Sequence, residues 1–309
     1  MVTKLRDGSN LAAFGGLLRR EPEVSVIVPA SENRAGEHLM NALGSVADQT
    51  IGQRNIRLFV AAGFDVDLGP FKGWATVVRV PSGPPGPKIA GAIRALNKAG
   101  LRSKLTGVLD DDDKYNPHKL EEGCNVFAAN PGLCFMVHSF SINAVDGAPP
   151  GRVRVVERFM QVVDNEVQQI TILDASQKLQ QAPWLAGVYF SWNSSRMLFD
   201  RTIVRPNVME WVGYNVDDFV AFEALRAKGR SIALHPEKLS AYTVHNGIST
   251  PATTDGYANV MQRWIGGHSK LITAFTGVPE IQAISLSNLH MLEVYRRNAK
   301  NRLSMYNTG

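Results

Sequence analysis

Short β-branched apolar runs alternate with amphipathic segments through the first third of the chain, and this alternation limits the possible folds more than any other feature. Runs typical of buried strands lie at residues 24–29, 56–62, 74–80 and 105–109. Helical stripes of apolar residues lie at 39–49 and 88–99. This order predicts an open α/β sheet flanked by helices. Such sheets bind ligands beyond the carboxyl ends of their strands, so functional side chains are expected just after residues 28, 62, 80 and 109.

The remainder of the chain is less regular, and its elements are predicted from the same patterns. Strands are expected at 135–143, 153–161, 187–191, 231–234 and 239–244. Helices are expected at 216–228 and, with an interruption near Gly277-Val-Pro279, from 257 to 302. We therefore divide the chain into an N-terminal extension (1–22), a main α/β domain (23–250) and a C-terminal helical region (251–309).

Composition and charge exclude several classes of protein. The 33 basic residues exceed the 28 acidic ones by only five, and no basic run is interleaved with aromatic residues, so nucleic-acid binding is not expected. No apolar run approaches the ~20 residues of a membrane span. The N-terminal apolar patch at 11–18 precedes two arginines, the reverse of a signal peptide, and two cysteines suit a reducing compartment. We expect a cytoplasmic protein, and the basic excess leaves open a preference for anionic substrates or a membrane surface.

Four consecutive aspartates, Asp110 to Asp113, directly follow the strand predicted at 105–109 and are the strongest chemical signal. Adjacent carboxylates repel one another, and burying any of them unpaired is costly. Mg²⁺ or Mn²⁺ resolves this conflict, because these ions prefer oxygen ligands and are usually held by one or two carboxylates together with substrate phosphates. The alternative is a solvated acidic turn. The position directly after an apolar strand favours the metal site.

Three further signals lie near predicted element ends. Asp217 and Asp218 begin the helix predicted at 216–228, where they either cap free N–H groups or serve as a general base. His245 follows an apolar strand and is a competent third ligand for Mn²⁺. Lys88 follows the Gly/Pro-rich loop 82–87 at a helix start and is a candidate phosphate contact. That loop is not a P-loop, and no G-x-G-x-x-G follows the first strand, which disfavours a dinucleotide cofactor.

Taken in order, these pieces resemble family 2 (GT-A fold) glycosyltransferases over about residues 23–250. The resemblance rests on Val24-Ser-Val-Ile-Val-Pro29, Leu43-Gly-Ser-Val-Ala-Asp-Gln-Thr50, the run from Leu109 to Asp113, Asp217-Asp218 and His245. It implies an α/β fold of GT-A (Rossmann-like) type, a mixed sheet flanked by helices, with a C-terminal helical extension. It also implies an enzyme, an inverting hexosyltransferase that uses Mn²⁺ or Mg²⁺. The donor would be a nucleotide-diphosphate sugar, with a UDP-sugar favoured, and the acceptor a hydroxyl of a carbohydrate or another molecule.

The resemblance also implies roles for individual residues. The base and ribose site would be lined by Pro29, Ala30, Ser31 and Glu32. In the D-x-D motif, Asp110 would be the first acid, Asp111 would lie near the ribose, and Asp112 would bind the metal with Asp110 and His245. The catalytic base would be Asp218, with Asp217 beside it. The acceptor would lie near Trp192, Trp211 and Tyr214.

The sequence departs from the family pattern in two places. Where the family often has Asp-Asp-Gly after the second strand, this chain has Ala61-Ala62-Gly63, so Asp65 or Asp67 is the candidate replacement for the base-contacting carboxylate. Of the Q-x-x-R-W motif of processive members only Arg263-Trp264 is present, which argues against a processive synthase. Two alternatives stay open, a metal-dependent nucleotidyltransferase and a non-catalytic protein that binds sugar nucleotides. The C-terminal helices are equally open to interpretation as a lid, a homo-oligomer contact or a contact with a lipid surface.

Overall fold

A mixed β-sheet of nine strands forms the centre of the computed structural model, which describes residues 24–100, 104–145, 148, 150–186, 193–245 and 254–299. The strands are β1 (Val24–Pro29), β2 (Ile56–Ala62), β3 (Thr76–Arg79), β4 (Leu105–Val108), β5 (Lys114–Tyr115), β6 (Leu133–Ala144), β7 (Thr171–Leu173), β8 (Met197–Asp200) and β9 (Ser231–Val244). Their order is β3-β2-β1-β4-β8-β6-β9-β5, with β7 paired to β9. The predicted α/β class with a mixed sheet is confirmed.

The sheet is parallel in its first half and mixed in its second. β1 pairs in parallel with β2 and β4, and β2 pairs in parallel with β3. β8 is antiparallel to both β4 and β6, which breaks the parallel order. The carboxyl ends of β1 to β4 therefore lie at one edge of the sheet, which is where the sequence pattern predicts the functional residues.

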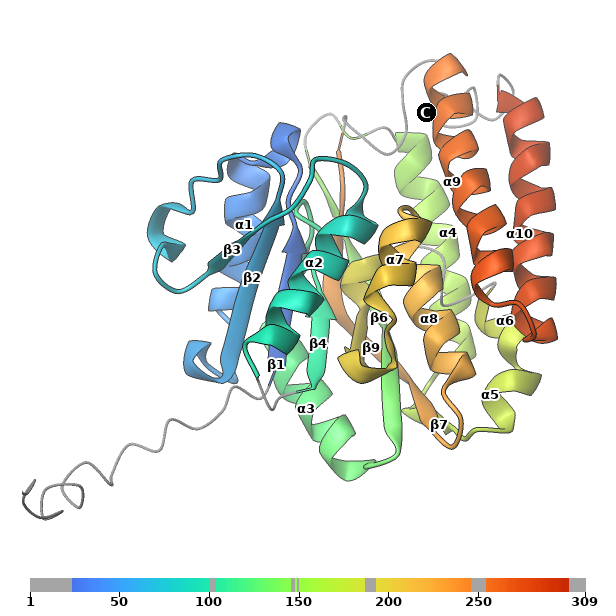
Figure 1. Cartoon of the computed structure of the whole chain (residues 1–309), viewed down its shortest axis with the longest axis horizontal. Coiled ribbons are helices and arrows are strands. Elements are labelled where there is room, and N and C mark those ends of the chain that lie inside the picture. Colours follow the sequence, from blue (N-terminus) through green and yellow to red (C-terminus); the bar gives the residue numbers. More distant parts are fainter. Residues whose placement is uncertain are drawn as a thin grey trace, which may run out of the picture.

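Helices cover both faces of the sheet (Figure 1). They are α1 (Glu37–Ala47), α2 (Pro85–Lys98), α3 (Lys119–Ala129), α4 (Pro150–Glu166), α5 (Gln177–Gln180), α6 (Ala182–Leu185), α7 (Pro206–Val212), α8 (Val216–Arg226), α9 (Thr254–Ala274) and α10 (Pro279–Arg297). Strand alternation divides the core between the faces. Val24, Val26 and Val28 of β1 pack with α1 and α3, whereas Ile27 packs on the side of α2, α7 and α8.

The helices α9 and α10 pack side by side at one end of the molecule (Figure 1). The core shared with α2, α7 and α8 includes Leu271 of α9 and Phe275, the residue directly after α9. It also includes Ile281 and Ile284 of α10. Further along, α9 and α10 form a smaller apolar cluster of their own that includes Met261 and Leu292. Among the described residues, no helix is both long enough and apolar enough to cross a membrane.

Three of the predicted elements differ in the structure. The strand expected at 153–161 is wrong, because these residues lie in helix α4. Val156 and Met160, four residues apart, are buried on one helical face, and this spacing outweighs the strand propensity of the valines. The strands expected at 231–234 and 239–244 form one strand, β9, with a register shift around Pro236. The strand expected at 187–191 and the extension 1–22 lie outside the described residues.

Candidate functional site

The acidic turn after β4, Asp110 to Asp113, is largely buried, which contradicts the alternative of a solvated turn. Asp111 and Asp113 are 2% and 1% exposed. Asp113 accepts hydrogen bonds from Asn193 Nδ2 at 2.5 Å, from Ser195 Oγ at 2.8 Å and from the Thr243 backbone N–H at 2.8 Å. These contacts tie the turn to the segment before β8 and to the end of β9. Burial raises the pKa of Asp113 well above its usual value.

A positive charge lies within hydrogen-bonding distance of this turn. Arg34, in the 3₁₀ turn after β1, contacts Asp111 Oδ1 at 3.0 Å through Nη1 and also donates to Asp112 Oδ2. His245 Nε2 lies 3.0 Å from the same oxygen of Asp112. Burial alone would raise the pKa of Asp112, but the contact with His245 and the charge of Arg34 outweigh it and lower the pKa. Asp112 is therefore a carboxylate at neutral pH.

Two of the three expected metal ligands are in contact, Asp112 and His245. In the ranges that the structure describes, no three His, Cys, Asp or Glu side chains gather as a ready-made metal site. The pair still fits Mg²⁺ or Mn²⁺, because these ions are commonly held by one or two protein ligands and completed by phosphate oxygens. Arg34 shares the carboxylate oxygen with His245, so a bound cation and Arg34 would compete for Asp112.

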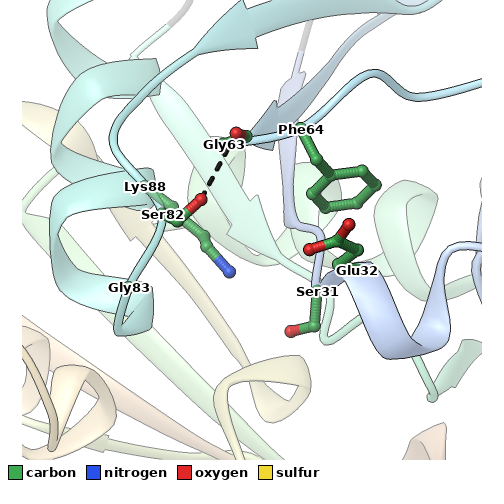
Figure 2. A pocket seen from close by; sticks show the side chains of 7 residues that line it. All are labelled: Ser31, Glu32, Gly63, Phe64, Ser82, Gly83 and Lys88. Carbon is green, nitrogen blue, oxygen red and sulfur yellow. Dashed lines mark hydrogen bonds between the residues drawn. The ribbon is translucent and has the colours of Figure 1, made fainter.

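A pocket of about 220 Å³ opens beside the turn, at the carboxyl ends of β1, β2 and β3 (Figure 2). Its lining residues are Ser31, Glu32, Gly63, Phe64, Ser82, Gly83 and Lys88. Lys88 is only 7% exposed, its Nζ donates to Ala30 O at 2.8 Å, and burial lowers its pKa. In Figure 2 the amine of Lys88 and the carboxylate of Glu32 both point toward the space between the lining residues.

The residues expected at the base and ribose site are only partly at this pocket. Ser31 and Glu32 line it, while Ala30 contributes the carbonyl that Lys88 contacts and Pro29 is buried as the last residue of β1. The Ser31 N–H donates to Asp111 Oδ2, which joins the pocket to the acidic turn. Asp65 does not line the pocket; its side chain is 97% exposed and paired with Arg79.

The acidic pair at the start of α8 lies within electrostatic reach of the turn. Burial, together with the charge of Asp218, raises the pKa of Asp217 to about 8. Burial and the charge of Asp112 likewise raise the pKa of Asp110 to about 8, and the charge of Asp217 adds to this shift. Asp218 is 3% exposed, and its Oδ2 accepts from Asn215 Nδ2 at 3.3 Å. At neutral pH Asp217 is therefore mainly protonated.

The aromatic residues expected near an acceptor lie on and after α7. Trp211 is 46% exposed, and Lys270 Nζ of α9 lies 5.8 Å from the centre of its ring. Arg263, also on α9, has its Cζ 5.9 Å from the ring of Tyr214. Trp192 lies outside the described residues. The two described aromatics thus stand beside cationic side chains of the C-terminal helices.

Sequence reasoning did not identify several residues of this site. Arg34 follows the end of the first strand, where functional residues were expected, so its position was a usable signal. Ser195 lacked any such signal, although its Oγ accepts from the Asp110 N–H at 2.9 Å. His268, whose Nε2 lies 3.6 Å from Asp218 Oδ2, is brought there only by the packing of α9. Nothing in its local sequence marks it.

Comparison with known proteins places the fold. No protein-family model matches the chain, and no curated protein is significantly similar to it in sequence. S. aureus TarS 1–349 in complex with UDP-GlcNAc superposes with a TM-score of 0.55 at 14% identity, over 89% of this chain and 72% of that one. The mannosyltransferase PcManGT from Pyrobaculum calidifontis, in complex with GDP-Man and Mn²⁺, gives 0.53 at 13% identity, over 92% and 74% of the two chains. The chain therefore has the α/β GT-A fold, as the resemblance implied.

Proposed function

We propose that this protein is a metal-dependent, inverting glycosyltransferase of the family 2 type. It transfers a hexosyl group from a nucleotide-diphosphate sugar, a UDP-sugar in the favoured case, to a hydroxyl of a carbohydrate or another acceptor. One observation supports this above all: the buried acidic turn with its Asp112–His245 contact lies within electrostatic reach of Asp217, at the start of α8. The structural likeness to proteins crystallised with UDP-GlcNAc and GDP-Man is consistent with it.

The donor nucleotide occupies the pocket at the ends of β1 to β3. Ser31 and Glu32 offer a hydroxyl and a carboxylate to the ribose, and Phe64 offers a ring face to the base. Lys88 lies across the pocket from these three residues (Figure 2), where its ammonium group attracts the phosphates. The buried Lys88 gains a charged partner when the donor binds, which favours its protonated form.

Asp112 and His245, with Asp110 nearby, would hold the divalent cation. When bound, that ion neutralises negative charge on the nucleoside diphosphate that leaves. In the free protein Arg34 contacts the carboxylate of Asp112, and its positive charge limits the repulsion among Asp110, Asp111 and Asp112. Asp113 keeps the turn in place through its three hydrogen bonds.

Asp218 acts as the general base. The oxygen of the acceptor hydroxyl attacks the anomeric carbon, the bond from that carbon to the diphosphate oxygen breaks, and the hydroxyl proton passes to a carboxylate oxygen of Asp218. Attack from the face opposite the leaving group inverts the anomeric configuration.

Calorimetry of UDP and GDP binding, with and without Mn²⁺, tests the donor site. We expect Mn²⁺ to strengthen binding, and Asp112→Ala to remove that metal dependence. The matched control is Asp48→Ala, since Asp48 is exposed at the end of α1 and does not line the pocket. Binding that is equal with and without metal in the wild type would contradict a metal-dependent donor site.

Release of nucleoside diphosphate from a panel of UDP-, GDP- and TDP-sugars, in extracts that supply acceptors, tests the reaction. We expect Asp218→Asn to bind the donor as the wild type does and to lose transfer. Wild-type rates in this variant would refute the role of Asp218. Binding without turnover in every extract would instead favour a non-catalytic protein, and formation of pyrophosphate would favour a nucleotidyltransferase.

A further inference from the structure

We propose that His268 of α9 is a positioning residue for the proposed base, donating its Nε2–H to Asp218 Oδ2, so that the C-terminal helices complete the active site. The role of Asp218 as a base rests on the proposed function, whereas the contact between His268 and Asp218 does not. Both side chains are buried, His268 at 4% and Asp218 at 3% exposure, and the two atoms lie 3.6 Å apart. A small movement of either side chain brings them within hydrogen-bonding distance.

Asp218 Oδ2 has a second hydrogen-bond donor besides His268. Asn215 Nδ2, on the residue before α8, lies 3.3 Å from Asp218 Oδ2. Asn215 has a φ of 59°, the only positive value at a non-glycine position in the described part of the chain. Asparagine is among the residues other than glycine that adopt left-handed backbone most readily.

A glycine of α9 leaves room for the side chain of Asn215. A Cβ atom at Gly267 would lie 1.9 Å from Asn215 Oδ1, so a side chain at position 267 would displace the amide group of Asn215. The next residue of α9 is His268. Consecutive residues of one helix thus make room for one donor to Asp218 and provide the other. Helix α9 therefore contributes polar contacts around the Asp218 carboxylate in addition to its apolar packing.

The protonation state of His268 suits a positioning role. Burial lowers the pKa of His268 to about 4, so the ring is neutral at neutral pH. Its Nδ1 is buried and has no hydrogen-bond partner among the described residues, whereas Nε2 faces a carboxylate. The proton is therefore expected on Nε2. A neutral donor fixes the direction of the Asp218 carboxylate without pairing its charge, which a base must keep.

Nitrogen NMR of the full chain labelled with ¹⁵N-histidine tests the contact without any assay of activity. His268→Gln identifies the resonances of His268. We expect the Nε2–H tautomer in the wild type, and a change in the ring resonances of His268 in Asp218→Ala. Asp48→Ala, at an exposed position after α1, is the matched control and leaves them unchanged. Resonances that do not respond to Asp218→Ala, or an Nδ1–H tautomer, would overturn the proposal.

Kinetics of two variants test the role. His268→Leu keeps a side chain of similar size without a donor, and we expect kcat to fall roughly 10- to 100-fold with the KM for the donor unchanged. His268→Gln keeps an N–H donor and is expected to recover most of that loss. His290→Leu, at an exposed position on α10, is the control and keeps the wild-type kcat. Equal losses in both His268 variants, or a change in KM alone, would refute a positioning role.

These experiments distinguish a failure of the proposed contact between His268 and Asp218 from a failure of the proposed glycosyltransferase function. If the wild-type protein transfers no sugar, the proposed function fails, while the resonances of His268 still decide whether it contacts Asp218. If His268→Leu fails to fold, which its thermal melting curve reveals, the comparison of His268→Gln with the wild type and the NMR response to Asp218→Ala decide the question.

Discussion

Asp113 illustrates how a single buried carboxylate fixes the geometry of its charged neighbours. It accepts three hydrogen bonds, from Asn193, Ser195 and Thr243, and is 1% exposed. Asp113→Ala leaves three buried donors without an acceptor, so we expect a loss of about 2–4 kcal/mol in the free energy of unfolding, measured by urea denaturation. Asp65→Ala is the control and should change it by less than about 0.5 kcal/mol. A loss below about 1 kcal/mol for Asp113→Ala would contradict the network.

Asp217 makes stability depend on pH in a predictable direction. Burial and the charge of Asp218 raise its pKa from 3.8 to about 8 in the folded protein. Between these values the folded state binds the proton more tightly than the unfolded state, so this group's contribution to stability is lost progressively as the pH rises toward 8. An asparagine at this position cannot ionise, so we expect the melting temperature of Asp217→Asn to rise relative to wild type between about pH 5 and pH 8. The corresponding gain is at least about 1 kcal/mol.

That measurement needs metal-free buffer, because a cation near Asp110 would change the local charge. Asp48→Asn is the control, since Asp48 is exposed, and its difference from the wild type should not vary over the same range. A difference between Asp217→Asn and the wild type that is constant across this pH range would show that Asp217 titrates normally.

Among the elements, the approach of α2 to α7 determines where Lys88 lies. The Gly86 N–H donates to Gly213 O at 2.8 Å, and a Cβ at Gly86 would lie 2.6 Å from Met209 O. Gly86→Ala therefore forces the start of α2 away from α7, and we expect a loss of about 1–3 kcal/mol by denaturant unfolding together with weaker nucleotide binding. Lys88, two residues later, moves with the helix.

Gly44 in α1 is the matched comparison for Gly86. A Cβ there would meet nothing closer than Phe71 Cζ at 4.0 Å. Since alanine is the better helix former, Gly44→Ala should stabilise the protein by about 0.5–1 kcal/mol. If both substitutions had the same effect, the close contact between α2 and α7 would not be real.

Elements with strong periodicity were predictable from sequence, and those formed by long-range packing were not. The run at 56–62 coincides with β2 because a buried parallel strand is apolar throughout. Residues 153–161 were misassigned because their valines favour a strand locally, while packing of Val156 and Met160 against β6 and β9 makes them helical. The path of β9 past Pro236 depends on a register shift against β6 that no local pattern contains.

The same distinction holds for the candidate site. The acidic run, Asp217-Asp218 and His245 were found because each follows or begins an element with a clear pattern. The contact between Arg34 and Asp112 spans 78 positions of sequence, and His268 reaches Asp218 from a helix that the sequence left without a role. Contacts of this kind arise from how elements pack, so one sequence alone does not reveal them.

At the scale of the whole molecule, α9 and α10 are joined to the sheet through its main core. Phe275, at 1% exposure, contacts Phe219 and Phe222 of α8, with ring centres 5.8 and 5.6 Å apart. Arg205 lies over the same ring, its Cζ 5.2 Å from the centre. The helix that carries Asp218 is thus fixed on one side by the C-terminal helices. We infer that α9 and α10 fold together with the sheet.

Phe275→Ala tests that inference. Removing a fully buried ring at this junction should lower the free energy of unfolding by about 3–5 kcal/mol, and unfolding should remain a single transition. Amide hydrogen exchange should then accelerate in β1 and β2 as well as in α9, because the elements unfold together. Leu286→Ala on α10, at a site 53% exposed, is the control and should stay within about 0.5 kcal/mol of the wild type. Faster exchange confined to α9 and α10 would mean that these helices unfold separately, and His268 would then be a contact made only when they dock.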